Sequence, residues 1–196
     1  YICNGRGSLF QVVVRASQQL NIPFYTYDIW LRKWSYFILE NETIHSLNLI
    51  KKLIKDLWNK EEENLKQKSE IGSRWFIKWR KGDDVRRFYA EEQIKKSLPP
   101  SFDKNKRNIV IFNSALEEFE CFPEWKAVLY DKEQDILKQI FTYFQNNETF
   151  FFYFRIHPNL QNLNNTQMRE LKELSNLNFK NVKIIWPHEK IDSYAL

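Results

Sequence analysis

Three short, predominantly apolar runs constrain the fold of this chain more than any other feature. They are NIVIF, FFFYFRI and VKIIW, which begin at residues 108, 150 and 182. Between them, apolar residues recur at helical spacing, at Ile136, Leu137, Ile140, Phe141 and Phe144, and then at Met168, Leu171 and Leu174. Strands that are apolar along their whole length are typical of parallel sheets covered on both faces. The second half of the chain therefore predicts an α/β lobe with a parallel sheet.

The first half shows a shorter version of the same alternation. YIC reads as a strand, the loop NGRGS follows, and Leu9, Val12, Val13, Ala16 and Leu20 form a helical face. The next strand, IPFYTYD, ends at Asp28, and these elements outline a right-handed parallel unit. Two further helices are predicted around residues 44–58 and 71–79. The chain is therefore expected to form two Rossmann-like lobes with parallel sheets.

The paired prolines of SLPPSFDKNKRN mark the boundary between the lobes, at residues 1–100 and 101–196. The chain opens on YICNGRG without an initiator methionine and stops at IDSYAL. The first end reads as a strand in progress and the second as a helix barely begun. We therefore expect a fragment whose first lobe lacks its start and whose second lobe is truncated.

Composition narrows the classes of partner. A formal charge of +5, from 30 basic and 25 acidic residues, suits an anionic ligand such as a nucleotide. Cys3 and Cys121 match no zinc or disulfide pattern, which favours reduced thiols in the cytoplasm. No apolar run approaches the roughly 20 residues of a membrane span. A peripheral membrane association fits the basic, aromatic-rich composition, although no amphipathic anchor stands out from the sequence.

Polar residues follow the predicted strands, at the sheet edge where open parallel sheets bind ligands. The candidates are Asn4, Gly5, Arg6, Asp28, Asn113, Ser114, His157 and Asn159. An imidazole at a strand end can donate a hydrogen bond to a phosphate, and Arg155 would add positive charge. Asp28 is a candidate general base by position. The simpler alternatives are a capped turn containing His157 and a helix-capping role for Ser114.

Residues 74–89, RWFIKWRKGDDVRRFY, interleave basic and aromatic side chains. Such a pattern can bind the phosphates of a nucleic acid and stack on its bases. The aromatic residues, however, share a helical face that we expect to point into the core. No nucleic-acid partner is therefore predicted.

Several of these segments together resemble the bacterial capsule polysaccharide biosynthesis proteins. The resemblance is carried by NGRG, NIPFYTYD, ETIH, NIVIFNSALEEFE, FYFRIHPNL and IIWPHEKIDSYAL, and it is strongest from Asn108 to Leu196. RIHPN is its most specific element. The resemblance implies a glycosyltransferase-B-type fold of two Rossmann-like lobes, with an acceptor-side lobe first and a nucleotide-donor lobe second.

The resemblance also implies roles for the candidate residues. His157 would contact the phosphate of the donor, and Asn113 and Ser114 would border the nucleotide pocket. Arg155 and Asn159 complete the donor-binding set. Asp28 would be the catalytic base, and Asn4, Gly5 and Arg6 would form the acceptor-side loop.

The function implied is transfer of a sugar from a nucleotide-activated donor to a surface polysaccharide or a lipid-linked acceptor. It would take place in the cytoplasm, at the inner face of the cytoplasmic membrane, with the nucleotide sugar as substrate and with no cofactor and no metal. Family members continue into a Ser/Thr phosphate-binding turn and a glutamate that meets the ribose. This chain ends before both, so half of the donor pocket is expected to be missing.

Three other functions fit the same pattern. A polyol-phosphate transferase and a nucleotide-sugar epimerase would share the two-lobed architecture. A noncatalytic component of polysaccharide assembly or export would keep the fold without the chemistry.

Overall fold

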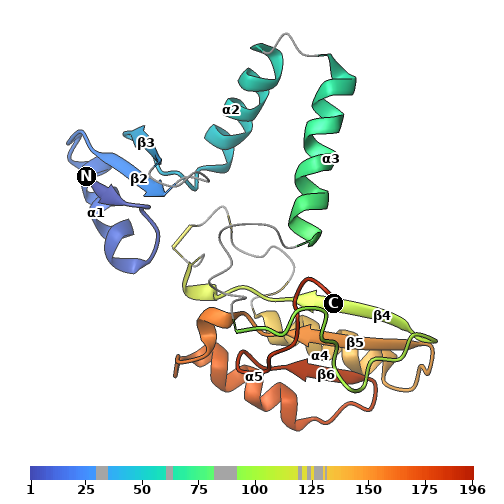
Figure 1. Cartoon of the computed structure of the whole chain (residues 1–196). Helices are drawn as coiled ribbons and strands as arrows, with labels where there is room; N and C mark the ends of the chain where they lie inside the picture. The colour runs from blue at the N-terminus through green and yellow to red at the C-terminus, as the bar shows by residue number, and fades with distance from the viewer. Residues whose placement is uncertain are drawn as a thin grey trace. The chain divides into compact units, whose positions relative to one another are not determined.

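A computed structural model describes residues 1–29, 35–60, 64–81, 92–118, 121–122, 125, 130 and 132–196. Within these residues the chain is α/β, with two three-stranded sheets (Figure 1). Each sheet belongs to a separate compact unit. The first unit comprises Tyr1–Gln67 and Leu116–Lys126, and the second comprises Lys68–Ala115 and Ala127–Leu196. Residues 68–100 thus group with the second sheet, and the division into an acceptor lobe and a donor lobe stays a prediction.

The sheet of the first unit is mixed, not parallel as the sequence had suggested. Strands β1 (Ile2–Cys3) and β2 (Tyr25–Ile29) are parallel and are joined through helix α1 (Ser8–Gln19). Strand β3 (Tyr36–Glu40) pairs antiparallel with β2 and was not predicted. Residues 36–39 of β3 are all apolar, but only Phe37 and Leu39 are half-buried, which is the one-sided cover of an edge strand and not the two-sided cover of a central parallel strand.

Helices α2 (Leu47–Lys60) and α3 (Leu65–Lys81) confirm the two helices predicted in the middle of the chain. No residue of either helix whose side chain is described is buried. The expectation that the aromatic face of α3 points into the core is therefore wrong, since Trp75 and Phe76 are 46% and 63% exposed. Helical periodicity shows that a face is apolar, but it does not show what covers that face.

The sheet of the second unit is entirely parallel, as predicted, with the strand order β4-β5-β6. Its strands are β4 (Arg107–Phe112), β5 (Phe150–Arg155) and β6 (Val182–Ile185). Helix α4 (Glu133–Phe144) connects the first two strands, and helix α5 (Thr166–Asn176) connects the last two. Because parallel crossovers share one hand and the strands follow in sequence order, both helices cover the same face.

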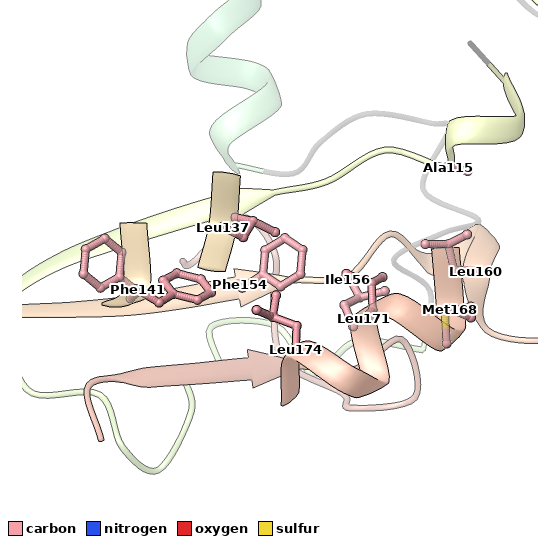
Figure 2. Close-up of a cluster of buried hydrophobic side chains, with 10 residues drawn as sticks. Ala115, Leu137, Phe141, Phe154, Ile156, Leu160, Met168, Leu171 and Leu174 are labelled. Atoms are coloured by element: carbon pink, nitrogen blue, oxygen red, sulfur yellow. The ribbon is translucent and has the colours of Figure 1, made fainter. Parts of the chain in front are cut away.

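The core of the second unit lies between that face and the two helices. Phe152, Phe154 and Ile156 pack there against Leu137 and Phe141 of α4 and against three residues of α5, which are Met168, Leu171 and Leu174. Figure 2 shows most of these side chains converging between β5 and the helices. The alternation of side chains along β5 sends its other residues to the opposite face.

A chain segment, and not a helix, covers Tyr153 on that opposite face. Tyr153 is fully buried, its hydroxyl donates to the Ser101 carbonyl at 2.9 Å, and its ring lies 5.7 Å from that of Phe102. The predicted two-sided cover of β5 is thus present at Tyr153, where the turn around Ser101 and Phe102 supplies it. Among the described residues, no helix has both the length and the apolar character needed to cross a lipid bilayer.

Candidate functional site at the carboxyl end of the second sheet

A pocket of about 200 Å³ lies at the carboxyl ends of β4 and β5. Phe112 and Arg155 are paired in register, so the two strands end side by side and their side chains share the face that carries Tyr153. Asn113 and His157 follow these strands directly, and both line the pocket. The pocket therefore lies at the sheet edge where β4 and β5 end.

Two hydrogen bonds fix the position of His157. Its backbone N–H donates to Asn113 Oδ1 at 2.7 Å, which ties together the loops after β4 and β5. Its ring Nδ1 accepts the backbone N–H of Asn159 at 3.2 Å and caps the one-turn 3-10 helix η4 (Pro158–Leu160). A ring that accepts at Nδ1 carries the proton of its neutral form on Nε2. His157 thus caps the turn, and the ring is half-buried at the sheet edge.

Asn113, which follows β4, is buried and lies beside both His157 and Glu133. Its Oδ1 accepts from His157, whereas its Nδ2 has no hydrogen-bond partner among the described residues. That Nδ2 lies close enough to the Glu133 carboxylate to favour its charged form, although the two do not meet in hydrogen-bonding geometry. Buried amide N–H groups are almost always paired, so an unpaired one beside a pocket points to a ligand.

Arg155 is only 2% exposed and holds the turn after β6. Its Nη1 donates to the carbonyl oxygens of Trp186 and Glu189, at 3.0 and 3.1 Å. Burial lowers the pKa of the guanidinium, and nearby Glu189 partly offsets this, but an arginine stays protonated. Nε has no hydrogen-bond partner among the described residues, and none of them forms an ion pair with Arg155. A fixed positive charge therefore lies beside the pocket.

The remaining two residues of the predicted donor set lie outside this pocket. Ser114 is exposed, and its carbonyl accepts from the buried Gln167 Nε2 at 2.8 Å. Asn159 lines a neighbouring pocket of about 180 Å³, which shares Gln93 and Pro158 with the first one. The structure thus brings together Asn113, Arg155 and His157.

The first unit has a pocket of its own, of about 600 Å³, beside the loop between β1 and α1. Asn4 and Arg6 line it together with Phe10, and Arg6 forms an ion pair of 3.2 Å with Glu118. Gly5 shapes the loop through its φ of +71°. A Cβ at Gly5 would also lie 3.3 Å from a methyl group of Thr26.

Asp28, the predicted base, lies within β2 and is not one of the residues that line this pocket. Its Oδ1 accepts the backbone N–H of Ile29 at 2.7 Å. The carboxylate is close enough to His45 to raise the pKa of that imidazole, an effect that burial outweighs. The structure therefore groups Asp28 with His45, and its catalytic role stays a prediction.

His45 is a residue whose environment the sequence did not predict correctly. It falls within the helix predicted at residues 44–58, but it precedes α2 and packs against the rings of Phe122 and Trp125, at 5.4 and 5.9 Å. Burial, and after it the charge of Arg6, lowers its pKa. Because Phe122 and Trp125 lie nearly 80 positions further along the chain, no local sequence signal could have indicated this contact.

Glu133, at the start of α4, gives the second unit a pH-dependent stability. Its carboxylate accepts from Gln167 Nε2 at 3.2 Å, but burial dominates and raises its pKa. The Glu133 carboxyl therefore loses its proton at a lower pH in the unfolded chain than in the folded one. The resulting stability is fully present below the unfolded pKa of a glutamate, about 4.3, and is lost as pH rises through the raised pKa.

We expect Glu133→Gln to remove this loss while keeping an oxygen that can accept from Gln167. The variant should be more stable than the wild type near neutral pH, with a difference that shrinks towards about pH 4. Urea unfolding followed by circular dichroism at both pH values measures this. A difference that does not change with pH would mean that the carboxyl does not titrate as inferred.

No group of three or more His, Cys, Asp and Glu residues that could hold a metal ion occurs in the part of the chain that the structure describes. Comparisons of the chain with protein-family models, with curated proteins and with solved structures found no match.

Proposed function

We propose that the pocket at the carboxyl ends of β4 and β5 binds a phosphate of a nucleotide-activated sugar. In this proposal the protein is a glycosyltransferase related to the capsule polysaccharide biosynthesis proteins. One observation carries it. Arg155 and Asn113, both buried, line the same pocket as His157, and each has a polar N–H without a hydrogen-bond partner among the described residues.

A phosphate oxygen is the kind of ligand that such a pocket favours. The guanidinium charge is not neutralised by an ion pair with any described residue, because the nearby Glu189 carboxylate bonds to Lys183 at 3.0 Å. Burying an unneutralised charge costs free energy, and an anion offsets that cost. Charge-assisted hydrogen bonds from guanidinium and amide N–H groups to phosphate oxygens are short and strong.

The same groups would favour the transfer reaction. The bond between the anomeric carbon and the donor phosphate breaks, the acceptor hydroxyl oxygen bonds to that carbon, and a base takes the hydroxyl proton. Negative charge grows on the departing phosphate, where preformed N–H donors and positive charge stabilise the transition state. His157 and Arg155 would serve the leaving group, and Asp28 remains the proposed base.

Nucleotide binding tests the proposal directly. We expect uridine diphosphate, guanosine diphosphate or cytidine monophosphate to bind the chain in a calorimetric titration. Asn113→Asp should weaken that binding at least tenfold, because an oxygen replaces the Nδ2 donor while the acceptor for the His157 N–H remains.

Asn105→Asp is the matched control. It makes the same change of charge on an exposed residue that does not line the pocket, and it should leave binding unchanged. Absence of binding by all three nucleotides, or an equal effect of the two substitutions, would overturn the proposal.

A further inference from the structure

Helix α3 has a wide apolar face on the surface of the protein. Leu65, Ile71, Trp75 and Phe76 are all exposed. At 100° per residue these four positions fall within an arc of about 140°. An arc of that width on a globular protein normally faces the core, yet no residue of α3 whose side chain is described is buried.

The other side of α3 is basic. Lys66, Arg74, Lys78 and Lys81 lie outside the apolar arc, whereas Lys68 lies within it. The whole helix contains six basic residues and one acidic residue, so its net charge of +5 equals that of the entire chain. Helix α3 thus combines an exposed apolar arc with an excess of positive charge.

Helix α2 repeats the pattern independently. Its exposed apolar side chains are Leu47, Ile54, Leu57 and Trp58, and it contains four lysines and one aspartate. No residue of α2 with a described side chain is buried. Two successive helices therefore share one design, an apolar face with aromatic residues and a polar face with excess positive charge.

We propose that α3 docks the protein onto the surface of an anionic lipid bilayer, and that α2 contributes a second binding element of the same kind independently. A helix with a basic polar face and with tryptophan and phenylalanine on its apolar face lies in the plane of the membrane interface. The apolar side chains enter the boundary of the acyl chains, and the indole rings favour the headgroup level. The lysines and arginines meet the negative lipid headgroups.

Two other binding partners, a second copy of the chain and a nucleic acid, would each be complementary to only one face of α3. A second copy of the chain could cover the apolar face but would bring two basic faces close together. A nucleic acid would match the charge and could stack on Trp75, but it would leave Leu65 and Ile71 in contact with water. An anionic bilayer would bury the apolar face of α3 and attract its basic face.

Co-sedimentation of the 196-residue chain with lipid vesicles tests the proposal. We expect binding to vesicles of equal parts phosphatidylcholine and phosphatidylglycerol, weaker binding to phosphatidylcholine alone, and a decrease with added salt. Trp75→Ser should lower the partition coefficient about tenfold, because it removes a large side chain from the apolar face.

Ile77→Ser is the matched control for that substitution. Ile77 is 53% exposed, close to the 46% of Trp75, but it lies on the basic side of the helix. Tryptophan, isoleucine and serine have similar helix propensities, so neither change should unfold α3. Ile77→Ser should leave vesicle binding unchanged, and circular dichroism checks that both variants keep their helix content.

Charge is tested with a second pair of double variants. Arg74→Gln with Lys78→Gln should weaken binding to the anionic vesicles about fivefold for each charge removed. Lys138→Gln with Lys172→Gln makes the same change of net charge on exposed residues of α4 and α5 and should have little effect.

Four results would overturn the proposal. They are equal binding to neutral and anionic vesicles, an equal effect of Trp75→Ser and Ile77→Ser, binding to an oligonucleotide but not to vesicles, and self-association that Trp75→Ser abolishes without any vesicle binding. None of these results depends on the pocket at Arg155, so this proposal and the proposed function can fail separately.

Discussion

Under the proposed glycosyltransferase function, replacing His157 with alanine is expected to lower the rate of sugar transfer about 100-fold or more. The ring lines the same pocket as Arg155 and Asn113, and its neutral form carries the proton on Nε2, where it can donate to a phosphate oxygen. Loss of one such donor removes stabilisation that is needed mainly in the transition state. Turnover of a nucleotide sugar with its acceptor measures the effect.

His157→Asn separates this role from that of a helix cap. An asparagine oxygen can accept the Asn159 N–H in place of Nδ1, and asparagine is a preferred N-cap residue. The variant should therefore keep the stability of the wild type but be as inactive as His157→Ala. Normal turnover in His157→Asn would show that the imidazole only caps the turn.

The largest expected effect on stability comes from Phe141→Ala. Phe141 is 0% exposed and packs edge-on against Phe152 and Phe179, at 5.6 and 5.7 Å between ring centres. Removing a buried phenylalanine costs transfer free energy and leaves a cavity, about 3–5 kcal/mol in total. Urea unfolding of the chain, followed by far-ultraviolet circular dichroism, measures the change.

Tyr143→Ala is the matched control, because it truncates an aromatic residue of the same helix that is 81% exposed. Tyrosine and phenylalanine have similar helix propensities, so the two changes differ mainly in burial. The control should alter the free energy of unfolding by no more than about 0.5 kcal/mol. Equal losses in the two variants would mean that α4 does not pack on the sheet through Phe141.

The second unit could be predicted well because its signals are local. Continuous apolar runs marked β4, β5 and β6, and helical spacing marked α4 and α5. A buried parallel strand must be apolar on both sides, so its identity is visible without knowledge of its neighbours. Strand β3 was missed although residues 36–39 are also apolar, because its antiparallel pairing with β2 depends on a partner strand that the five residues do not encode.

Within the candidate site, the sequence correctly identified the sheet edge at which polar residues gather. It could not show that Arg155 is buried beneath the turn after β6, or that the Asn113 side chain holds the backbone of His157. These contacts join positions more than 30 residues apart, and the registers of β4 and β6 against β5 decide them. His45 illustrates the same limit in the first unit.

The sequence by itself determined which segments are strands and helices in the second unit, and which faces of α2 and α3 are apolar. Periodicity and strand composition are properties of a chain segment alone, and local sterics and hydration are enough to express them. Only the tertiary structure decided that the face of α3 stays exposed and that Arg155, Asn113 and His157 share one pocket. Burial and convergence depend on which distant segments pack together, and that is a property of the whole fold.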